Sequence, residues 1–327
     1  MTYRPPFSLT PKIFSLSQKI SHGLGILEGE KFDVEPLKLR RENNIKTIQS
    51  SLAIEGNTLS VEEVTRILEG KRVLGPQKDI LEVQNALAVY EKFDTFKPTS
   101  AKDFLAAHKI LMENLTPENG VWRTGNVGVF QGKHVAHMAP PAKRVPDLMK
   151  NLFNFIQKDK ETPWLIKACV FHYELEFIHP FTDGNGRMGR LWQQLLLTQE
   201  NPLFKFITVE TLIKENQAQY YKVLHQCDKE GNSTAFIEFS LNLVLLALQD
   251  SMSQPHKPLK DALSRLTYGQ EKLKDLWFSR KDYMTLFKEI SSATASRDLK
   301  MGLEKVLLKS KGHHNAVRYH YTVTKKE

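Results

Sequence analysis

Residues 179–190 read HPFTDGNGRMGR, a run rich in glycine and charged residues. The residues before it, Trp164 to Ile178, are strongly apolar and predict a buried central helix. Pro180 prevents that helix from continuing, so His179 is expected at its end. After the run, leucines recur at helical spacing and predict a second buried helix. The run is therefore predicted to be the loop that joins two core helices.

The composition of this loop predicts an anion-binding site. Gly184 and Gly186 flank Asn185 and permit the backbone angles that bring main-chain N–H groups close to a ligand. A phosphate held there would also face the N-terminus of the following helix. Arg187 and Arg190 are three residues apart, so they project from one face of its first turn and can bind further phosphates.

Two more side chains of the loop carry reactive groups. Asp183 offers a hard carboxylate oxygen for a Mg²⁺ ion that bridges phosphates. His179 has the pKa suited to accepting a hydroxyl proton near neutral pH. A base, a metal ligand, an anion-binding backbone and two arginines together predict phosphoryl-transfer chemistry. The alternative, a glycine-rich connector with surface arginines, does not explain why all these residues occur together.

The run resembles the signature of the Fic family, HPFx(D/E)GNGRxxR, and matches it at every defined position. The resemblance implies a protein adenylyltransferase that moves AMP from ATP, with Mg²⁺, onto a Tyr, Ser or Thr hydroxyl of a target protein. It implies that His179 is the base that deprotonates this hydroxyl for attack on the α-phosphate. Family members that transfer phosphate instead depart at the position of Gly186, so the glycine here favours AMP transfer.

The resemblance also implies roles for the other loop residues, which hold the nucleotide and the metal. They are Phe181 as a buried anchor, Asp183 as the Mg²⁺ ligand between the α- and β-phosphates, Gly184, Asn185 and Gly186 as the anion hole, Arg187 at the β-phosphate and Arg190 at the γ-phosphate. His179 and Asn185 are thus the expected catalytic residues. Tyr220, Tyr221 and Asp228 lie where relatives line the adenine pocket; helix packing and capping explain them equally well.

A second motif lies upstream. Ser51 and Glu55 are four residues apart and share a helix face, and Gly56 is placed to end that helix. A carboxylate at a helix C-terminus opposes the helix dipole unless a cation offsets it. The stretch resembles the family's inhibitory helix, (S/T)xxxE(G/N), in the class that carries it N-terminal to the active loop. By that resemblance Glu55 pairs with Arg190 and blocks the γ-phosphate. The alternative is a solvent-exposed glutamate at a helix end.

Residues Val127 to Val135 predict a β-hairpin within an otherwise helical chain. The hairpin resembles the family's flap, which binds the target protein by strand addition. The expected fold is therefore mainly α: a Fic-type helical bundle with a small hairpin flap, followed by a C-terminal winged-helix domain.

The winged-helix expectation rests on the pattern beyond a break at residues 251–258. Helix, turn, helix and hairpin follow in the winged-helix order, with Ser279 capping the first helix. From residue 251 onward the chain has 16 lysines and arginines against 8 acids, within a net charge of +9. DNA is therefore a candidate partner of residues 251–327. A solvated lysine-rich surface, and a module that packs on the core or recruits a protein, are the open alternatives.

The second helix of this module carries charges of both signs. Arg297, Lys300 and Lys305 are placed to meet phosphates. Asp298 and Glu304 are expected to repel them. Charge alone therefore does not decide between DNA and protein as the partner.

The bulk properties favour a cytoplasmic protein without membrane contact. The composition, 41% hydrophobic and 25% charged, is ordinary for a globular chain, and two cysteines give no disulfide framework. The N-terminus has no signal-peptide layout, and the apolar stretch Leu241 to Leu248 falls short of the ~20 residues that a membrane span needs.

Three parts are expected: an N-terminal helical region with the inhibitory helix at 1–95, a Fic core at 96–250, and a winged helix-turn-helix domain at 251–327. A homodimer stays open. Two functions rival AMP transfer. One is a deAMPylase that uses Glu55 to remove AMP from a target, and the other is a DNA-binding regulator whose Fic core senses nucleotide.

Overall fold

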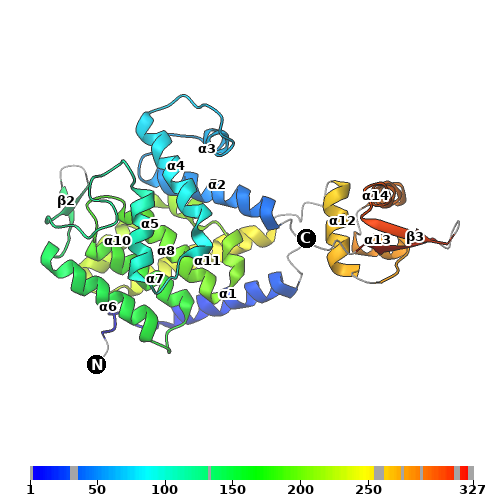
Figure 1. Ribbon diagram of the computed structural model, residues 1–327. Helices are drawn as coiled ribbons and strands as arrows, with labels where there is room; N and C mark the ends of the chain where they lie inside the picture. The colour runs from blue at the N-terminus through cyan, green and yellow to red at the C-terminus, as the bar shows by residue number, and fades with distance from the viewer. Residues whose placement is uncertain are drawn as a thin grey trace. The chain divides into compact units, whose positions relative to one another are not determined.

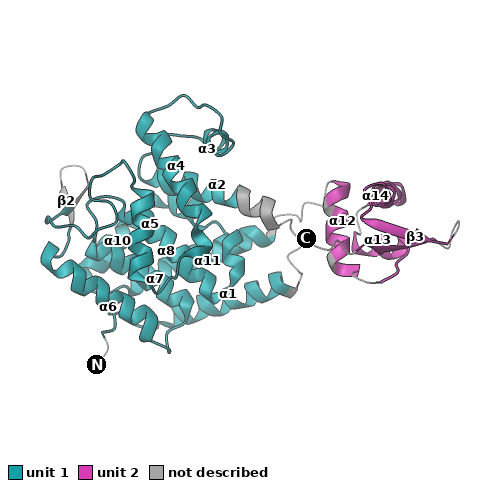
Figure 2. Cartoon of the chain, viewed as in Figure 1, with its two compact units in different colours: residues 1–31, 38–253 teal, residues 32–37, 254–327 magenta. Residues whose placement is uncertain are grey.

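The computed structural model describes residues 3–29, 36–131, 134–253, 261–273, 276–287, 290–312 and 317–322. The chain divides into two compact units, shown in Figure 2. Unit 1 comprises residues 1–31 and 38–253, and unit 2 comprises residues 32–37 and 254–327. The predicted turns of both hairpins, at 132–133 and 313–316, lie outside the described residues.

Unit 1 is a bundle of helices with one small hairpin (Figure 1). Its helices are α1 (Pro11–Gly29), α2 (Pro36–Ile54), α3 (Val61–Leu68), α4 (Gln77–Glu91), α5 (Ala101–Leu111), α6 (Val145–Lys158), α7 (Trp164–Ile178), α8 (Asn185–Glu200), α9 (Val209–Glu215), α10 (Gln217–Glu230) and α11 (Thr234–Ser253). Short 3₁₀ turns lie at Phe93–Thr95, Ala142–Arg144 and Pro202–Phe206. The hairpin pairs β1 (Gly128–Gln131) with β2 (His134–Met138) in antiparallel register, with an irregularity after Val129. The predicted mainly α fold with a hairpin is confirmed.

Helices α7 and α8 form the centre of unit 1. Every residue of α7 from Leu165 to Leu175 is buried, and so is every residue of α8 from Arg187 to Thr198. The two helices pack against each other, while α6, α10 and α11 pack on α7. Helices that are covered on all sides must be apolar or internally paired around their whole circumference. The loop between them is consequently fixed by the most buried part of the fold.

Residues Thr234–Met252 of α11 are long and apolar enough to cross a membrane by length and composition. This stretch is longer than the Leu241–Leu248 run considered in the sequence. Within unit 1, α11 packs against α1, α7, α9 and α10, and 44% of the stretch is buried. These contacts are those of a core helix in a bundle.

The two helix boundaries beside Ser51 and Glu55 follow from local chemistry. Gly56 adopts φ 91°, and the Asn57 N–H donates to the carbonyl of Leu52, which ends α2 in a Schellman motif. Ser60 caps α3 through a capping box with Glu63. The glycine at the end of α2 was predicted from the sequence.

Unit 2 contains α12 (Ala262–Leu273), α13 (Arg280–Leu286), α14 (Ser292–Glu304) and a hairpin of β3 (Leu308–Lys311) with β4 (Arg318–Tyr321). Phe278 adds a bridge to Tyr319 of β4. The predicted helix, turn, helix and hairpin are present, and Ser279 caps α13 with a capping box. Helix α12 and the bridge at Phe278 were not predicted. A small core gathers between these elements, built from Leu266, Phe278, Tyr283, Ala295, Leu299, Leu308 and Tyr321.

Asp298, which was expected to repel phosphates, is buried and paired inside unit 2. Asp298 is 1% exposed, and Arg265 of α12 donates to it through Nε at 2.5 Å and Nη2 at 2.8 Å. Its charge is therefore compensated inside unit 2 by a planar two-bond pair. The sequence did not reveal this because the helix that supplies Arg265 was not predicted.

Candidate active site

The run at 179–190 turns the chain sharply between α7 and α8. His179 ends α7 with φ 50° and ψ 60°, and its N–H donates to the carbonyl of Leu175 at 2.8 Å. A left-handed conformation is uncommon for a residue other than glycine and concentrates at functional sites. Pro180 follows, and Gly184 at φ 87° begins α8 as its N-cap. The half-buried His179 therefore lies at the junction of two buried helices.

The side chain of Asn185 closes this loop. Its Oδ1 accepts from the N–H of Phe181 at 2.9 Å, and its Nδ2 donates to the carbonyl of Phe181 at 2.9 Å. Phe181 is fully buried against Phe104, Trp122 and the parallel ring of His108. The Asn185 side chain thus shapes the loop, and its backbone N–H lies in the first turn of α8, where helices bind anions.

His108 of α5 contacts the loop through the Asp183 carbonyl. This contact was not predicted from the sequence. Its Nδ1 accepts from the N–H of Gly120 at 2.8 Å, so Nε2 carries the proton and donates to the Asp183 carbonyl at 3.0 Å. Burial lowers the pKa of His108 to about 4, which keeps the ring neutral. A single histidine in an amphipathic helix gave no sequence signal for this role.

Arg123 fixes the other side of the loop and was also not predicted. It is 2% exposed, and its guanidinium donates to the last carbonyls of α7, those of His179 at 2.7 Å and Ile178 at 3.3 Å. A cation stabilises the C-terminus of a helix. Its remaining donors reach the carbonyls of Gly125 at 2.8 Å and Pro140 at 2.5 Å, on either side of the hairpin. One buried side chain therefore ties the base of the hairpin to the backbone of His179.

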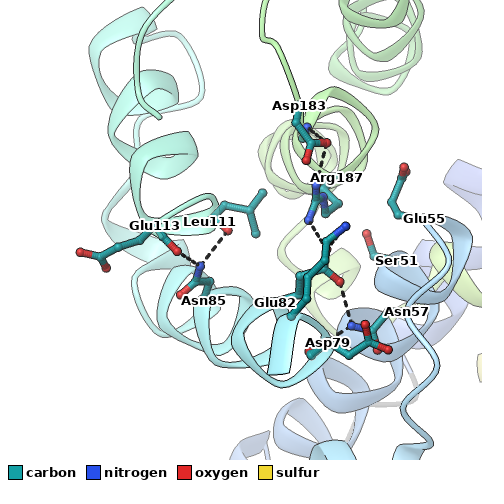
Figure 3. A network of polar contacts seen from close by, with 12 residues as sticks. Ser51, Glu55, Asn57, Asp79, Glu82, Asn85, Leu111, Glu113, Asp183 and Arg187 are labelled. Atoms are coloured by element: carbon teal, nitrogen blue, oxygen red, sulfur yellow. Dashed lines mark hydrogen bonds and ion pairs between the residues drawn. The ribbon is translucent and has the colours of Figure 1, made fainter. Parts of the chain in front are cut away.

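The structure brings Glu55 and Arg190 together. Arg190 Nη2 donates to Glu55 Oε1 at 2.7 Å, while Nε donates to Ser51 Oγ at 3.0 Å and Nη2 also reaches the Ser51 carbonyl at 3.0 Å. The Arg190 side chain is 1% exposed and that of Glu55 33%. Burial disfavours the charged form of Arg190 and by itself would lower its pKa. The attraction of the Glu55 carboxylate outweighs this effect and raises the pKa above the ordinary value. Ser51 and Glu55 extend from the end of α2 toward the loop (Figure 3).

Gly186 provides the space in which the Glu55 carboxylate lies. A β-carbon built at this position would collide with Glu55 Oε1 and would lie 3.1 Å from Arg190 Nη1. A side chain at 186 would therefore displace the glutamate from the arginine.

Arg187 lies between two carboxylates. Its Nη2 donates to Asp183 Oδ1 at 2.9 Å, and its Nη1 donates to Glu82 Oε1 of α4 at 3.1 Å (Figure 3). The side chains of Arg187 and Glu82 are 5% and 6% exposed, whereas that of Asp183 is 51% exposed. Glu82 was not predicted, because nothing in its own helix marks it as a partner of the loop.

Asp183 is the metal ligand implied by the sequence. Its Oδ1 also accepts from the N–H of Gly184 at 2.6 Å. Within the described ranges, no group of three or more His, Cys, Asp or Glu side chains gathers to form a metal cage. A half-exposed carboxylate beside a helix N-terminus fits Mg²⁺ binding that is completed by ligand oxygens and water.

The two tyrosines predicted for the adenine pocket differ in environment. Tyr220 is 2% exposed and its hydroxyl pairs with Nε2 of His172 at 3.0 Å, so it packs in the core. Tyr221 is 39% exposed. Burial raises the pKa of Tyr221, and the nearby charge of Glu55 raises it further. Tyr221 thus lies on the side of α10 that faces Glu55 at the end of α2.

Asp228, the third of these residues, lies in the last turn of α10. It accepts from the hydroxyl of Tyr173 at 3.2 Å. Tyr173 belongs to α7, so this contact ties α10 to the helix that carries His179.

The loop combines a histidine at the end of α7, the N-terminus of α8 and two buried arginines. Helical proteins with this combination have the groups needed to bind phosphate. Residues 98–197 match the model described as the Fic/DOC family. A Fic family protein from Desulfovibrio desulfuricans G20, solved by crystallography, is 39% identical with a TM-score of 0.75. The match covers 99% of this chain and 100% of that one. The chain belongs to the Fic family.

Curated relatives match over shorter shares of their length. The protein adenylyltransferase Fic of Nematostella vectensis is 30% identical over 246 residues, which are 70% of this chain and 55% of that protein. The protein adenylyltransferase fic-1 of Caenorhabditis elegans is 27% identical over 250 residues, 70% of this chain and 46% of that protein. The chain thus spans about half the length of these curated relatives.

Proposed function

We propose that the protein is a protein adenylyltransferase that transfers AMP from ATP to a Tyr, Ser or Thr hydroxyl of a target protein and is restrained by Glu55. The observation that carries the proposal is the seating of Glu55 on Arg190, within the loop that begins at His179. The names of the curated relatives agree with it.

In the proposed reaction His179 accepts the proton of the target hydroxyl. The hydroxyl oxygen then bonds to the α-phosphorus, the bond from this phosphorus to the bridging oxygen breaks, and pyrophosphate leaves. His179 Nδ1 lies 3.4 Å from the carbonyl oxygen of Glu176. Donation by Nδ1 to this oxygen leaves Nε2 as the proton acceptor.

The N-terminus of α8 and its two arginines would hold the phosphates. The first N–H groups of a helix lack intrahelical acceptors and bind anions. Arg187 would take the β-phosphate and Arg190 the γ-phosphate. Asp183 would hold Mg²⁺, which neutralises charge on the phosphates and on the leaving pyrophosphate.

Glu55 restrains the reaction by competing for one arginine. Arg190 Nη2 cannot serve the carboxylate and a phosphate fully at once, and the two anions repel each other. Because Arg190 is buried while Glu55 is one-third exposed, the pair is only partly shielded from water, and its strength lies between that of a surface pair and that of a fully buried one.

The direct test is intact-mass analysis of the Glu55→Gly protein after incubation with ATP and Mg²⁺. We expect a mass gain of one AMP unit on the protein or an added target, well above that of the unmodified protein. His179→Ala in the same background should abolish it; transfer that persists without His179 would overturn the mechanism. The deAMPylase alternative predicts AMP release from a modified target with Mg²⁺ alone, dependent on Glu55.

Two partner proposals accompany the core reaction. The hairpin at Val127 to Val135 would bind the target protein by strand addition to one of its edges. Unit 2 would be a winged-helix module, with DNA as its candidate ligand. The pairing of Asp298 with Arg265 supports this, since it leaves Arg297 and Lys300 exposed on α14 without that opposing charge. Salt-dependent binding of the full chain to duplex DNA tests it, and binding that is absent at low salt would contradict it.

A further inference from the structure

Glu82 is a buried carboxylate whose two oxygens serve different partners. Its side chain is 6% exposed on α4. Oε1 accepts from Arg187 Nη1 at 3.1 Å, and Oε2 accepts from Asn57 Nδ2 at 2.8 Å (Figure 3). Lys78 lies 3.9 Å from Oε1 with its own side chain 71% exposed. A buried charge requires such partners, so the position of Glu82 is strongly determined.

Arg187 in turn depends on Glu82. Its Nη2 is bound by Asp183, and its buried Nε has no hydrogen-bond acceptor among the described residues. Asp183 is half-exposed and is the expected ligand of Mg²⁺, so its hold on Arg187 is the contact that a nucleotide would exchange. Glu82 is the contact that would remain.

Asn57 connects this pair to the inhibitory segment. It follows Glu55 by two residues, and its Nδ2 also donates to the carbonyl of Asp79 at 3.0 Å. Thr58 binds the Asp79 carboxylate through its N–H and its hydroxyl at 2.8 and 2.6 Å. These hydrogen bonds attach the turn after α2 to α4. The inhibitory segment consequently contacts Arg190 directly and Arg187 through one intermediate, Glu82.

We propose that Glu82 is a positioning residue that holds Arg187 for the β-phosphate, and that Asn57 fixes Glu82 in this role. The inference rests on the proposed function, in which Arg187 binds that phosphate. When a phosphate oxygen replaces Asp183 at Nη2, Glu82 keeps Nη1, so the guanidinium need not reorganise. Groups that are held in place before the ligand arrives bind and stabilise charge better than mobile ones.

The test compares ADP with AMP by calorimetry, with Mg²⁺, in the full-length Glu55→Gly protein. ADP has a β-phosphate and lacks the γ-phosphate, so the comparison isolates Arg187 from Arg190. In the Glu82→Gln variant we expect ADP affinity to fall about tenfold, the effect of losing one charge-assisted hydrogen bond, while AMP affinity changes less than about twofold. Glu82→Asp, which keeps the charge on a shorter side chain, should recover part of the ADP affinity.

Two matched controls separate positioning from general stability. Asn85, one turn along α4, donates to the carbonyls of Leu111 and Glu113 at 3.3 and 2.8 Å and does not reach the loop (Figure 3). Asn85→Ala should leave the ratio of ADP to AMP affinity unchanged. Asn57→Ala should lower that ratio about threefold, whereas Thr58→Val, which alters the same turn without touching Glu82, should not.

The outcomes are distinct. Equal weakening of ADP and AMP in Glu82→Gln, or an unchanged ratio in both Glu82→Gln and Asn57→Ala, would overturn the positioning role. If Glu82→Gln does not fold, Glu82→Asp and Asn57→Ala decide the question by the same ratio. A Glu55→Gly parent that prefers ADP to AMP yet transfers no AMP would overturn the proposed function alone, and the ADP-to-AMP ratio in the Glu82 variants would still decide the role of Glu82 in nucleotide binding.

Discussion

Arg190 Nη2 lies 2.7 Å from Glu55 Oε1, across 135 positions of sequence. The arginine belongs to the first turns of α8, one of the two central helices, and the glutamate belongs to the C-terminus of α2, where the helix dipole disfavours a carboxylate. Each residue compensates the other. A phosphate that binds Arg190 must therefore displace a carboxylate that has no equivalent partner at the end of its own helix.

Ser51 should contribute to the proposed restraint through its hydroxyl, which accepts from Arg190 Nε at 3.0 Å. Ser51→Ala should raise the rate of AMP transfer by roughly tenfold or less, since it removes one hydrogen bond to a charged group and leaves Glu55 in place. Initial rates at fixed ATP measure the change. Ser50→Ala is the control, because Ser50 Oγ contacts Thr211. A Ser51→Ala protein no faster than this control would contradict the role of Ser51.

The effect of a substitution at Gly186 on the free energy of unfolding should depend on whether Glu55 is present. Gly186→Ala places a methyl group against the Glu55 carboxylate, so we expect it to lower the free energy of unfolding by about 1–3 kcal/mol. In a Glu55→Ala background the loss should be less than half as large, because the colliding group is gone. Urea unfolding of the four proteins gives the coupling energy. Equal losses in both backgrounds would show that the glutamate does not occupy this space in solution.

His108 should make the protein sensitive to acid. Its pKa is lowered to about 4 in the folded chain by burial, against about 6.5 when unfolded, so the unfolded chain binds more protons between these values. Stability from the neutral ring is present above pH 6.5 and is lost as the pH falls toward 4. His108→Gln should remove roughly 2 kcal/mol of the loss between pH 7 and pH 5. Urea unfolding at both pH values measures it, and an identical loss in the variant would refute the assignment.

The pair of Arg265 and Asp298 should determine the stability of unit 2. Arg265→Met leaves a carboxylate buried without its cation, which typically costs about 3–5 kcal/mol. Adding Asp298→Leu should restore most of that loss, because the unpaired charge is removed as well. Hydrogen exchange of the α14 amides in the full chain reports both effects. A double variant as unstable as Arg265→Met would mean that the pair is not buried as described.

Local patterns were sufficient to predict much of this structure. The loop at 179–190, the glycine that ends α2 and the Ser279 cap each depend on residues a few positions apart, whose spacing has a direct geometric meaning. The hairpins were predicted for the same reason. The pairing of Glu55 with Arg190 came from the resemblance to the Fic family, since no local rule links residues so far apart.

The supporting residues could not be predicted in this way. His108 contacts a carbonyl 75 positions away, and Glu82 contacts a guanidinium 105 positions away. Arg123 binds backbone oxygens, which every residue carries, so its partners leave no trace in the sequence. Such contacts are defined by how helices pack, and packing is set by the whole bundle.

The most direct test is the crystal structure of the Glu55→Gly protein with Mg²⁺ and an ATP analogue that cannot transfer AMP. The account predicts the triphosphate wrapped by the loop, with the γ-phosphate on Arg190, the β-phosphate on Arg187 and the α-phosphorus beside His179. A nucleotide bound elsewhere, or a loop without nucleotide when Glu55 is absent, would contradict it.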